Sequence, residues 1–308
     1  MDPAVVEAIG AALGEPVRTS RPIGGGDSSD AWRVELADDS VVFAKTDPDG
    51  IAGLFTSEAD GLRRLAATGA VRVPQVLAVA DRADRRDDDS GGGGSGSNDS
   101  DSDGSRFLVL GWIEPGRPDP DHDAELGRSL AALHRTSAPR FGLEVDNHLG
   151  RRRQVNTWCD SWAELYGRFR LAPITRLAVD AGVLSDDTVA RIDRLIVRLP
   201  ELVGPPEPPA LVHGDLWAGN ALVDSDGRPW LIDPAVSYSH REIDLAMMRL
   251  FGGFGPSVFA AYDEAFPLAD GWSDRVELLQ LYYLLLHTLH PSPAGYLGAV
   301  DHILRRYT

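Results

Sequence analysis

Two carboxylates and an amide lie close together in the stretch "LVHGDLWAGNALVDSDGRPWLIDPA", residues 211–235. Asp215 is followed five residues later by Asn220, and Asp233 comes after a second short apolar segment. A carboxylate can accept the proton of an attacking hydroxyl, while an amide oxygen and a second carboxylate are hard ligands that suit Mg²⁺. The pattern therefore predicts phosphoryl transfer, with Asp215 as the base and Asn220 and Asp233 as metal ligands.

The Asp-to-Asn spacing alone has a second interpretation, because both residue types also cap the backbone of ordinary turns. The surroundings favour phosphoryl transfer: His213 precedes the pair, a predicted hairpin follows it, and Asp233 lies in "IDP". Protein kinases use the same spacing, with His-Arg-Asp where this chain has His-Gly-Asp. We expect His213 to support the loop rather than to transfer protons.

Lys45 is the only lysine of the chain, since 29 of the 30 basic residues are arginines. It ends the β-like run "VVFAKT", where it shares a strand face with Phe43 and needs a partner. Glu58 is the predicted partner, because Leu54 and Leu62, four residues to each side, turn it inward on a helix. Such a pair positions nucleotide phosphates in kinases. A lysine reaching solvent from a strand end is the alternative, but arginine would serve there equally well.

Two further segments are candidates for nucleotide contacts. The run "GGGDSSDAW" (24–32) offers Gly24, Gly25 and Gly26, whose backbone N–H groups could approach phosphates. A flexible turn is an equally good interpretation of a glycine run between two strands. In "LVLGWI" (108–113), the backbone groups of Gly111 and Ile113 are candidates for hydrogen bonds with an adenine.

The elements that must position these residues form a β-rich first third and a helical remainder. Short strands are expected over residues 17–23, 30–36, 40–46, 73–81 and 107–113. One helix is expected over 56–70, with Thr56 or Ser57 as its N-cap. Further helices are expected over residues 123–136, 157–182 and 185–202 and through most of the segment from 236 to 308. The sequence predicts an α+β fold, with a small antiparallel β lobe (1–113) before a larger, mainly helical lobe (114–308).

Residues 84–105 form a polar Gly/Ser/Asp tract between two of the predicted strands. Such a composition cannot bury enough apolar surface to fold, so we expect a disordered insertion at a hairpin tip. The spacing of its aspartates fits no EF-hand pattern, and no function is assigned to it.

Composition and charge exclude several classes of protein. The net charge is −17 and 34 of the 47 acidic residues are aspartates, which disfavours nucleic acid or an anionic membrane as partner. High Asp and Arg contents suggest a protein that works at high salt, or simply a GC-rich genome. The single Cys159 allows neither an internal disulfide nor a cysteine zinc cluster. The N-terminus is typical of a capped helix, and the apolar stretch 278–290 is too short to span a membrane, so we expect a cytoplasmic protein.

Taken together, these stretches resemble the fructosamine (ketosamine) kinases, a family with the aminoglycoside-phosphotransferase-like kinase fold. The resemblance implies a bilobal, protein-kinase-like arrangement. "HGD…N" indicates only that broad fold, whereas Trp217 within it and two long segments are narrower signatures. The matching segments are "GGG" (24–26), Lys45, Glu58, "TGAVRVP" (68–74), "LAALHR" (130–135), "FGLEVDNHLGRRRQVNTWCDSW" (141–162), "RLAP" (170–173), "HGDLWAGN" (213–220) and "IDPAVSYSHREIDLAMMRLFGGF" (232–254).

The resemblance implies an ATP-dependent kinase that phosphorylates the sugar 3-hydroxyl of a ketosamine, the rearranged product of an amine and a reducing sugar. The phosphorylated adduct is unstable, so the family acts in deglycation. By position, Asp215 is the implied base, Asn220 and Asp233 hold Mg²⁺, and Lys45 with Glu58 positions the phosphates of ATP.

The resemblance also assigns residues to the acceptor side and to the support of the loop. Trp217 would lie at the acceptor pocket, where its ring can pack on a sugar. Asp244 would brace the catalytic loop, with an acid stabilised by a helix N-terminus as the alternative. The family's C-terminal motif is altered here to "HTLHPSPAGY". His287 and His290 are therefore candidates for an acceptor-facing histidine, or else core or surface histidines.

One departure concerns the glycine run. Many members carry a cysteine after the glycines, which gives redox control through an intermolecular disulfide. This chain has Asp27 at that position, so no such switch is expected. We expect a monomer or weak dimer.

Two other functions stay open. The acceptor could be another small hydroxyl compound, as in aminoglycoside or choline kinases, or the chain could be an inactive ATP-binding sensor. The presence of all the residues that the reaction needs argues against the sensor.

A chain with one lysine offers almost no ε-amine to glycation. We therefore hypothesise that small-molecule or N-terminal ketosamines are the main substrates.

Overall fold

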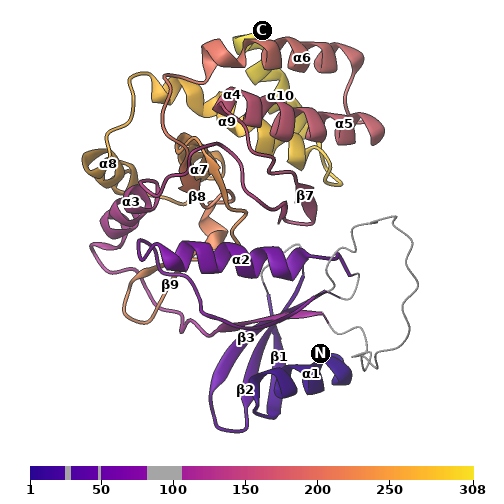
Figure 1. Ribbon diagram of the computed structural model, residues 1–308, viewed down its shortest axis with the longest axis vertical. Helices are drawn as coiled ribbons and strands as arrows, with labels where there is room; N and C mark the ends of the chain where they lie inside the picture. The colour runs from indigo at the N-terminus through magenta and orange to yellow at the C-terminus, as the bar shows by residue number, and fades with distance from the viewer. Residues whose placement is uncertain (25–28, 48–49, 82–105) are drawn as a thin grey trace. The chain divides into compact units, whose positions relative to one another are not determined.

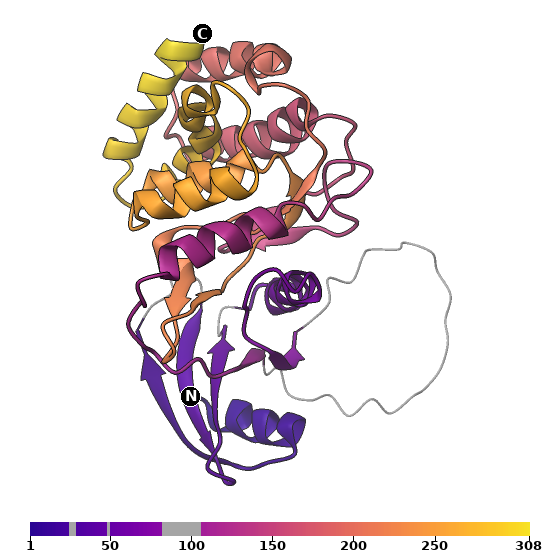
Figure 2. The ribbon, with the colours of Figure 1, turned by 90° about the vertical axis from the view of Figure 1, so that its left-hand side faces the viewer.

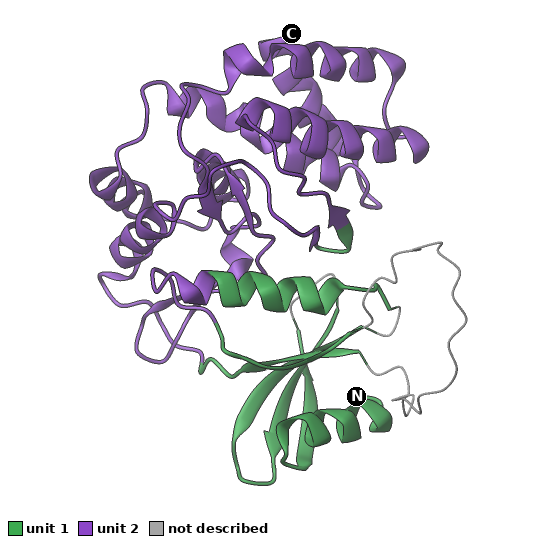
Figure 3. Cartoon of the chain, in the orientation of Figure 1, with its two compact units in different colours: residues 1–64, 74–114, 150–152 green, residues 65–73, 115–149, 153–308 purple. Residues whose placement is uncertain are grey.

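The computed structural model describes residues 1–24, 29–47, 50–81 and 106–308, which form two compact units (Figure 3). Unit 1 contains Met1–Arg64, Pro74–Glu114 and Gly150–Arg152, and unit 2 contains Leu65–Val73, Pro115–Leu149 and Arg153–Thr308. The insertion predicted at 84–105 lies outside the described residues.

Unit 1 is built on one five-stranded antiparallel sheet (Figures 1 and 2). Its strands are β1 (Val17–Ile23), β2 (Asp30–Leu36), β3 (Val41–Thr46), β4 (Val76–Ala80) and β5 (Phe107–Gly111), in the spatial order β1-β2-β3-β5-β4. Each of these strands falls within a run that the sequence predicts to be extended.

The two faces of this sheet carry different side chains because successive residues of a strand point to opposite sides. On one face, Val42 and Ala44 of β3 pack in an apolar cluster with Ile9 of helix α1 (Pro3–Leu13). On the other face lies Lys45, which contacts Glu58 of helix α2 (Leu54–Ala67). The strand thus turns Lys45 toward α2, on the face that it shares with Phe43, while Val42 and Ala44 pack on the α1 face.

The N-terminus of α2 differs from the prediction. The helix begins at Leu54, and its first N–H groups are capped by Asp81, whose Oδ2 accepts from Phe55 N (2.9 Å) and Thr56 N (3.2 Å). Ser57 lies within the first turn and donates its hydroxyl to the Leu54 carbonyl (2.9 Å). The assignment of Thr56 or Ser57 as the cap was wrong, because the capping carboxylate comes from a residue distant in sequence.

Unit 2 contains most of the helices, together with short paired strands. The remaining elements are α3 (His122–Leu133), β6 (Asn147–Leu149), β7 (Arg152–Gln154), α4 (Trp162–Tyr166), a π-helical segment (Gly167–Leu171), α5 (Ala172–Asp180), α6 (Asp186–Leu202), β8 (Ala210–Val212), a 3₁₀ turn (Ala218–Asn220), β9 (Ala221–Val223), β10 (Pro229–Leu231), β11 (Ser237–Ser239), α7 (Glu242–Leu250), α8 (Pro256–Ala265), α9 (Trp272–His287) and α10 (Ala294–Tyr307). The α+β fold class predicted from the sequence is confirmed.

Helix α7 lies between the two apolar clusters of unit 2. Ala246 and Met247 pack in the cluster that contains α9 and α10, while Leu245 and Met248 pack in the one that contains α3 and α8. An acid on this helix, Asp244, is therefore fully buried. Helix α9 carries the most apolar stretch of the sequence and is buried within the same unit. None of the helices in the described part of the chain is both long and apolar enough to cross a membrane.

The single helix expected over 157–182 is three segments. The helix does not include the residues before Ser161, and the backbone of Cys159 pairs with that of Phe141 in an isolated antiparallel β-bridge. Ser161 caps α4, accepting from Glu164 N (3.2 Å), and the π-helical segment then leads into α5. A π-helical turn inserts an extra residue and often occurs near functional sites. Here it carries Arg170, which is almost fully buried.

Candidate active site

The loop that carries Asp215 follows β8 and is anchored by Asp244 of α7. Asp244 Oδ2 accepts from His213 N (2.7 Å) and its Oδ1 accepts from Gly214 N (2.8 Å). Burial raises the pKa of this carboxyl, but hydrogen bonds and nearby histidines outweigh burial and hold the pKa below its usual value. A buried, ionised carboxylate thus satisfies two backbone donors immediately before Asp215.

Two residues that the sequence analysis did not single out hold Asp244 in turn. His134, at the end of α3, places Nε2 3.1 Å from Asp244 Oδ2, so Nε2–H donates to the carboxylate. The other ring nitrogen of His134 lies 2.8 Å from the hydroxyl of Tyr262 on α8. His134 lies in the family-like segment "LAALHR", and this resemblance is the signal in the sequence that could have pointed to it. Its contact with Asp244 is visible only in the folded structure.

His213 is completely buried and uses both ring nitrogens within the loop. Its Nε2–H donates to the carbonyl of Ile232 (2.9 Å), and Nδ1 accepts from Asp215 N (3.3 Å). Burial lowers the pKa of His213, which agrees with a ring that donates through one nitrogen and accepts through the other. Its contacts suit the supporting role expected for it.

Gly214 cannot be replaced without moving the loop. Its φ is +85°, and a Cβ there would lie 2.1 Å from the carbonyl oxygen of Ala235. Its own carbonyl accepts from the Tyr283 hydroxyl of α9 (2.8 Å). The His-Gly-Asp sequence therefore reflects a close approach between the loop that carries Asp215 and the segment that follows Asp233.

Asp215, Asn220 and Asp233 are brought together as the spacing predicts. Asn220 Nδ2 donates to the backbone carbonyl of Asp215 (2.8 Å) and to its Oδ2 (3.2 Å). Ile232 N donates to the carbonyl of Asn220 (3.0 Å), which places the next residue, Asp233, beside the loop. Burial raises the pKa of the Asp215 carboxyl to about 7, and the charge of Asp233 adds to the increase, while the bond from Asn220 opposes it.

The donor set fits a magnesium ion. The amide nitrogen of Asn220 is committed to Asp215, which leaves Oδ1 as the atom that a metal could use. The charge of Asp233 helps to raise the pKa of Asp215, and a divalent cation at the two carboxyl groups would offset their negative charge. In the part of the chain that the structure describes, no three His, Cys, Asp or Glu residues are grouped to hold a metal. Two protein ligands are sufficient for Mg²⁺, since it keeps waters and binds phosphate oxygens.

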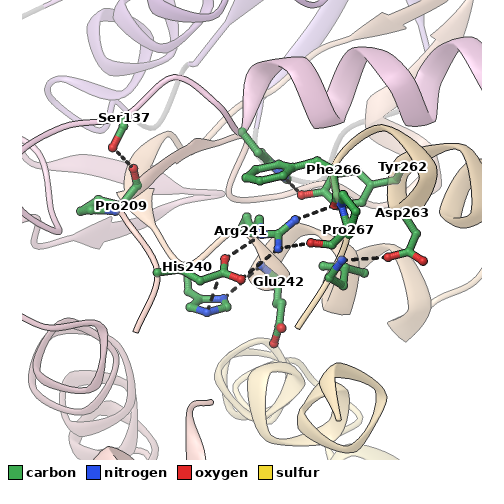
Figure 4. Close-up of polar contacts among 12 residues, drawn as sticks. Ser137, Pro209, His240, Arg241, Glu242, Tyr262, Asp263, Phe266 and Pro267 are labelled. Carbon is green, nitrogen blue, oxygen red and sulfur yellow. Dashed lines mark hydrogen bonds and ion pairs between the residues drawn. The ribbon is translucent and has the colours of Figure 1, made fainter. Parts of the chain in front are cut away.

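The corner between β11 and α7 is fastened by two ion pairs, and Figure 4 shows the contacts of Arg241, which belongs to the first of them. Arg241 binds Glu207 through Nε (2.7 Å) and Nη2 (2.9 Å), and also donates to two backbone carbonyls after α8. Glu242 binds Arg275 of α9 at 2.6 Å and 2.9 Å. Bidentate pairs of this kind restrict geometry. They set the first turn of α7, which carries Asp244.

A buried polar network ties the segment after Asp233 to the rest of unit 2. Arg170 donates to Asn156 Oδ1 (2.6 Å), and Asn156 and Gln154 both donate to Asn147 Oδ1 (2.9 and 3.0 Å). Asn147 Nδ2 then donates to the carbonyl of Val236 (2.8 Å). These residues lie in segments that resemble the family, and their buried side chains pair with one another and with backbone carbonyls.

In unit 1, the structure brings Lys45 and Glu58 together. Lys45 Nζ lies 2.8 Å from Glu58 Oε1, and the two side chains are 7% and 11% exposed. The assignment of this pair to ATP phosphates stays a prediction.

The other nucleotide candidates are placed as follows. Gly24 is exposed at the end of β1, and Gly25 and Gly26 lie outside the described residues. Gly111 ends β5 and donates its N–H to the carbonyl of Gln75 (2.8 Å), so its own carbonyl is the group left for a nucleotide. Ile113 follows two residues after β5 and is partly exposed.

Trp217, which is predicted to contact the acceptor, is 41% exposed and lies two residues after Asp215. Its ring meets that of Phe251, with centroids 6.5 Å apart, and Phe251 in turn lies 5.0 Å from the ring of His287. His290 stacks on His287 at 5.1 Å. Phe251 was not among the predicted site residues, although it lies in the family segment "FGGF".

Replacing Asp244 by Asn tests the anchor. One amide oxygen can still accept, but the NH₂ group would face a backbone N–H, so we expect a loss of about 2–4 kcal/mol in the free energy of unfolding. Urea unfolding measures this loss, with Asp160→Asn as a control, because that side chain is 84% exposed. The pKa of Asp244 is lowered from 3.8, so the difference should be complete above about pH 4 and shrink below it. Equal stability of the variant and wild type at neutral pH would remove Asp244 from this role.

Comparison with known proteins defines the class first. The crystal structure of the aminoglycoside phosphotransferase APH(4)-Ia matches with a TM-score of 0.62 at 16% identity and covers 99% of both chains. The protein thus has the kinase-like fold of that class.

The chain belongs to the fructosamine kinase family, whose family model matches residues 1–308. A probable ketoamine kinase of Enterococcus faecium is 36% identical over 287 residues, which is 93% of this chain and 94% of the relative. A crystal structure from Thermobifida fusca, of a suggested fructosamine-3-kinase, matches with a TM-score of 0.83 at 34% identity over 98% of both chains.

Proposed function

We propose that the protein transfers the γ-phosphoryl group of ATP to the sugar 3-hydroxyl of ketosamines of the fructosamine or ribulosamine type, and so acts in deglycation. The observation that carries the proposal is the Asp215 carboxylate, which is bonded to Asn220 and lies beside the charge of Asp233, in a chain of the fructosamine kinase family. The similarity to a probable ketoamine kinase and to a suggested fructosamine-3-kinase supports this acceptor.

In the proposed reaction, Asp215 accepts the proton of the 3-hydroxyl as its oxygen attacks the γ-phosphorus. The new P–O bond forms while the bond to the bridging oxygen of ATP breaks, so the products are the 3-phosphate, ADP and a proton. Asn220 fixes the Asp215 carboxylate through its Nδ2–H bond. Asn220 Oδ1 and Asp233 would hold Mg²⁺, which supplies positive charge at the phosphates.

The nucleotide is assigned to groups of unit 1. Lys45, oriented by Glu58, would contact the phosphates as a point charge. Gly24, Gly25 and Gly26 would offer backbone N–H groups to them, and the carbonyl of Gly111 and the backbone of Ile113 would bind the adenine. These roles rest on the strand order that places β3 between β2 and β5.

Turnover of a panel of acceptors tests this function. ATP-dependent phosphorylation of a fructosamine and a ribulosamine should proceed, and NMR of the product should place the phosphate on O3. Aminoglycosides and choline should give no turnover. Transfer to these compounds alone would contradict the proposal and would favour the other acceptor class. ATP binding with no transfer to any acceptor would favour an inactive sensor.

We further infer a cytoplasmic protein that acts as a monomer or weak dimer on small or N-terminal ketosamines and tolerates high salt. The single lysine of the chain supports the substrate preference, and the net charge of −17 supports the salt tolerance. Comparing turnover of free ketosamines with that of a glycated protein, at low and at molar salt, tests these two points. A strong preference for protein-bound glycated lysine would contradict the substrate preference.

A further inference from the structure

Two exposed aromatic side chains meet beside the proposed base. Among the large apolar side chains that are exposed in the described residues, only Trp217 (41%) and Phe251 (43%) are aromatic. Their rings contact each other edge to face, with centroids 6.5 Å apart and planes at 77°. Trp217 comes from the loop of Asp215, whereas Phe251 follows α7. Core packing does not explain an exposed pair drawn from such distant segments, and grouped exposed apolar side chains are typical of binding sites.

Glycines hold this pair in position. Gly252 and Gly253 have φ values of +70° and +91°, and a Cβ at Gly253 would lie 2.4 Å from Cβ of Ala218. A Cβ at Gly219 would lie 2.2 Å from the ring of Trp217. Left-handed backbone and close approach therefore require glycine at these positions. The chain after α7 is shaped to bring Phe251 against the turn that carries Trp217.

The rings continue onto the end of α9 and the start of α10. The ring of His287 lies 5.0 Å from that of Phe251, and those of His290 and Tyr296 lie 5.1 and 5.0 Å from His287. His287 Nδ1–H donates to the carbonyl of Tyr283 (2.7 Å), and the hydroxyl of Tyr283 binds the carbonyl of Gly214. We call Trp217, Phe251, His287, His290 and Tyr296 the aromatic platform. It is connected to the loop of Asp215 directly at Trp217 and, through Tyr283, at His287.

We propose that Phe251 and His287 of the aromatic platform bind the substituent on the ketosamine nitrogen, so that the enzyme selects amines with an apolar or aromatic substituent. This inference rests on the proposed function. When O3 lies at Asp215, three carbons separate it from the nitrogen, which falls roughly 5 Å away for C–C bonds of about 1.5 Å. Trp217 is the platform residue nearest to Asp215 in the chain, so the substituent extends from it toward Phe251.

Charge supports the same orientation of the substrate. The nitrogen of a ketosamine is a secondary amine that is protonated at neutral pH, and tryptophan faces attract such cations. Arg249, the basic residue nearest in sequence to Phe251, stacks on Phe259 and Trp272 at 4.8 and 4.1 Å instead. The platform therefore suits a cationic nitrogen followed by an uncharged, flat or apolar group.

A matched pair of substrates tests the proposal: fructosyl-methylamine and fructosyl-benzylamine, which share the sugar and differ in the substituent. The wild type should favour the benzyl compound in kcat/KM by about tenfold, the magnitude of one aromatic contact. Phe251→Ala should lower this ratio by about tenfold, and Phe251→Tyr should restore most of it. Val197→Ala is the control, because Val197 is 80% exposed on α6 and should leave the ratio unchanged.

The ratio of kcat/KM and the oligomeric state of the variant decide whether the inference holds. A ratio near one in the wild type, or the same ratio in wild type and Phe251→Ala, overturns the inference. A change of oligomeric state in Phe251→Ala without a change of ratio would identify the platform as a contact between copies and would also overturn it. If Phe251→Ala does not fold, the same ratio of kcat/KM is measured in Phe251→Leu, and a ratio equal to that of the wild type overturns the inference. Absence of turnover with both substrates would instead contradict the proposed function.

Discussion

Replacing Asp215 by Asn should lower kcat by about 10³-fold, within the range for loss of a general base. Asn has almost the same shape as Asp and can still accept from Asn220, which bonds the Asp215 side chain at 3.2 Å in the wild type. It cannot take the proton of the attacking hydroxyl. A coupled assay of ADP release measures kcat, and calorimetry should show that the variant still binds ATP.

Loss of activity through unfolding can be distinguished from loss of the base. Burial raises the pKa of Asp215 from 3.8 to about 7, so the ionised carboxylate costs stability above that pH. Asp215→Asn removes this cost and should be at least as stable as the wild type at pH 8. Asp226→Asn, at an exposed position of the hairpin that follows, is the matched control and should keep full activity. Unchanged turnover in Asp215→Asn would remove Asp215 from the role of base.

Replacing Lys45 by Arg should lower kcat/KM for ATP by about 10²-fold, comparable to the loss of one positioned donor. The Lys45 side chain is only 7% exposed and pairs with Glu58 at 2.8 Å, so a longer and planar guanidinium does not fit the same space. A guanidinium also favours two parallel bonds to the carboxylate, which would draw its charge toward Glu58.

The control for this change is Arg21→Lys on β1, where the side chain is 66% exposed. It exchanges the same two residue types in the same sheet and should leave ATP use unchanged. Full activity of Lys45→Arg would show that the single lysine of the chain is an accident of composition.

Local signals predicted much of the fold and the grouping of the candidate site residues. The strands of unit 1 alternate apolar and polar residues, and Lys45 and Glu58 could be paired because periodicity places each on an inward face. The group of Asp215, Asn220 and Asp233 was also predictable, because a short loop and one hairpin bring the three together. Helix boundaries were less predictable: α2 is capped by Asp81, and the helix expected over 157–182 is interrupted.

The sequence by itself determined the fold class and the kind of chemistry, and it predicted the residues that would carry this chemistry, since these depend on periodicity and on short-range spacing. Only the tertiary structure decided what holds them. Asp244 receives N–H groups from a loop some 30 residues before it, with His134 and Tyr262 behind it. Phe251 joins Trp217 because three glycines permit the approach. Such contacts join segments far apart in the chain, and their partners are selected by packing of the whole unit rather than by any local pattern.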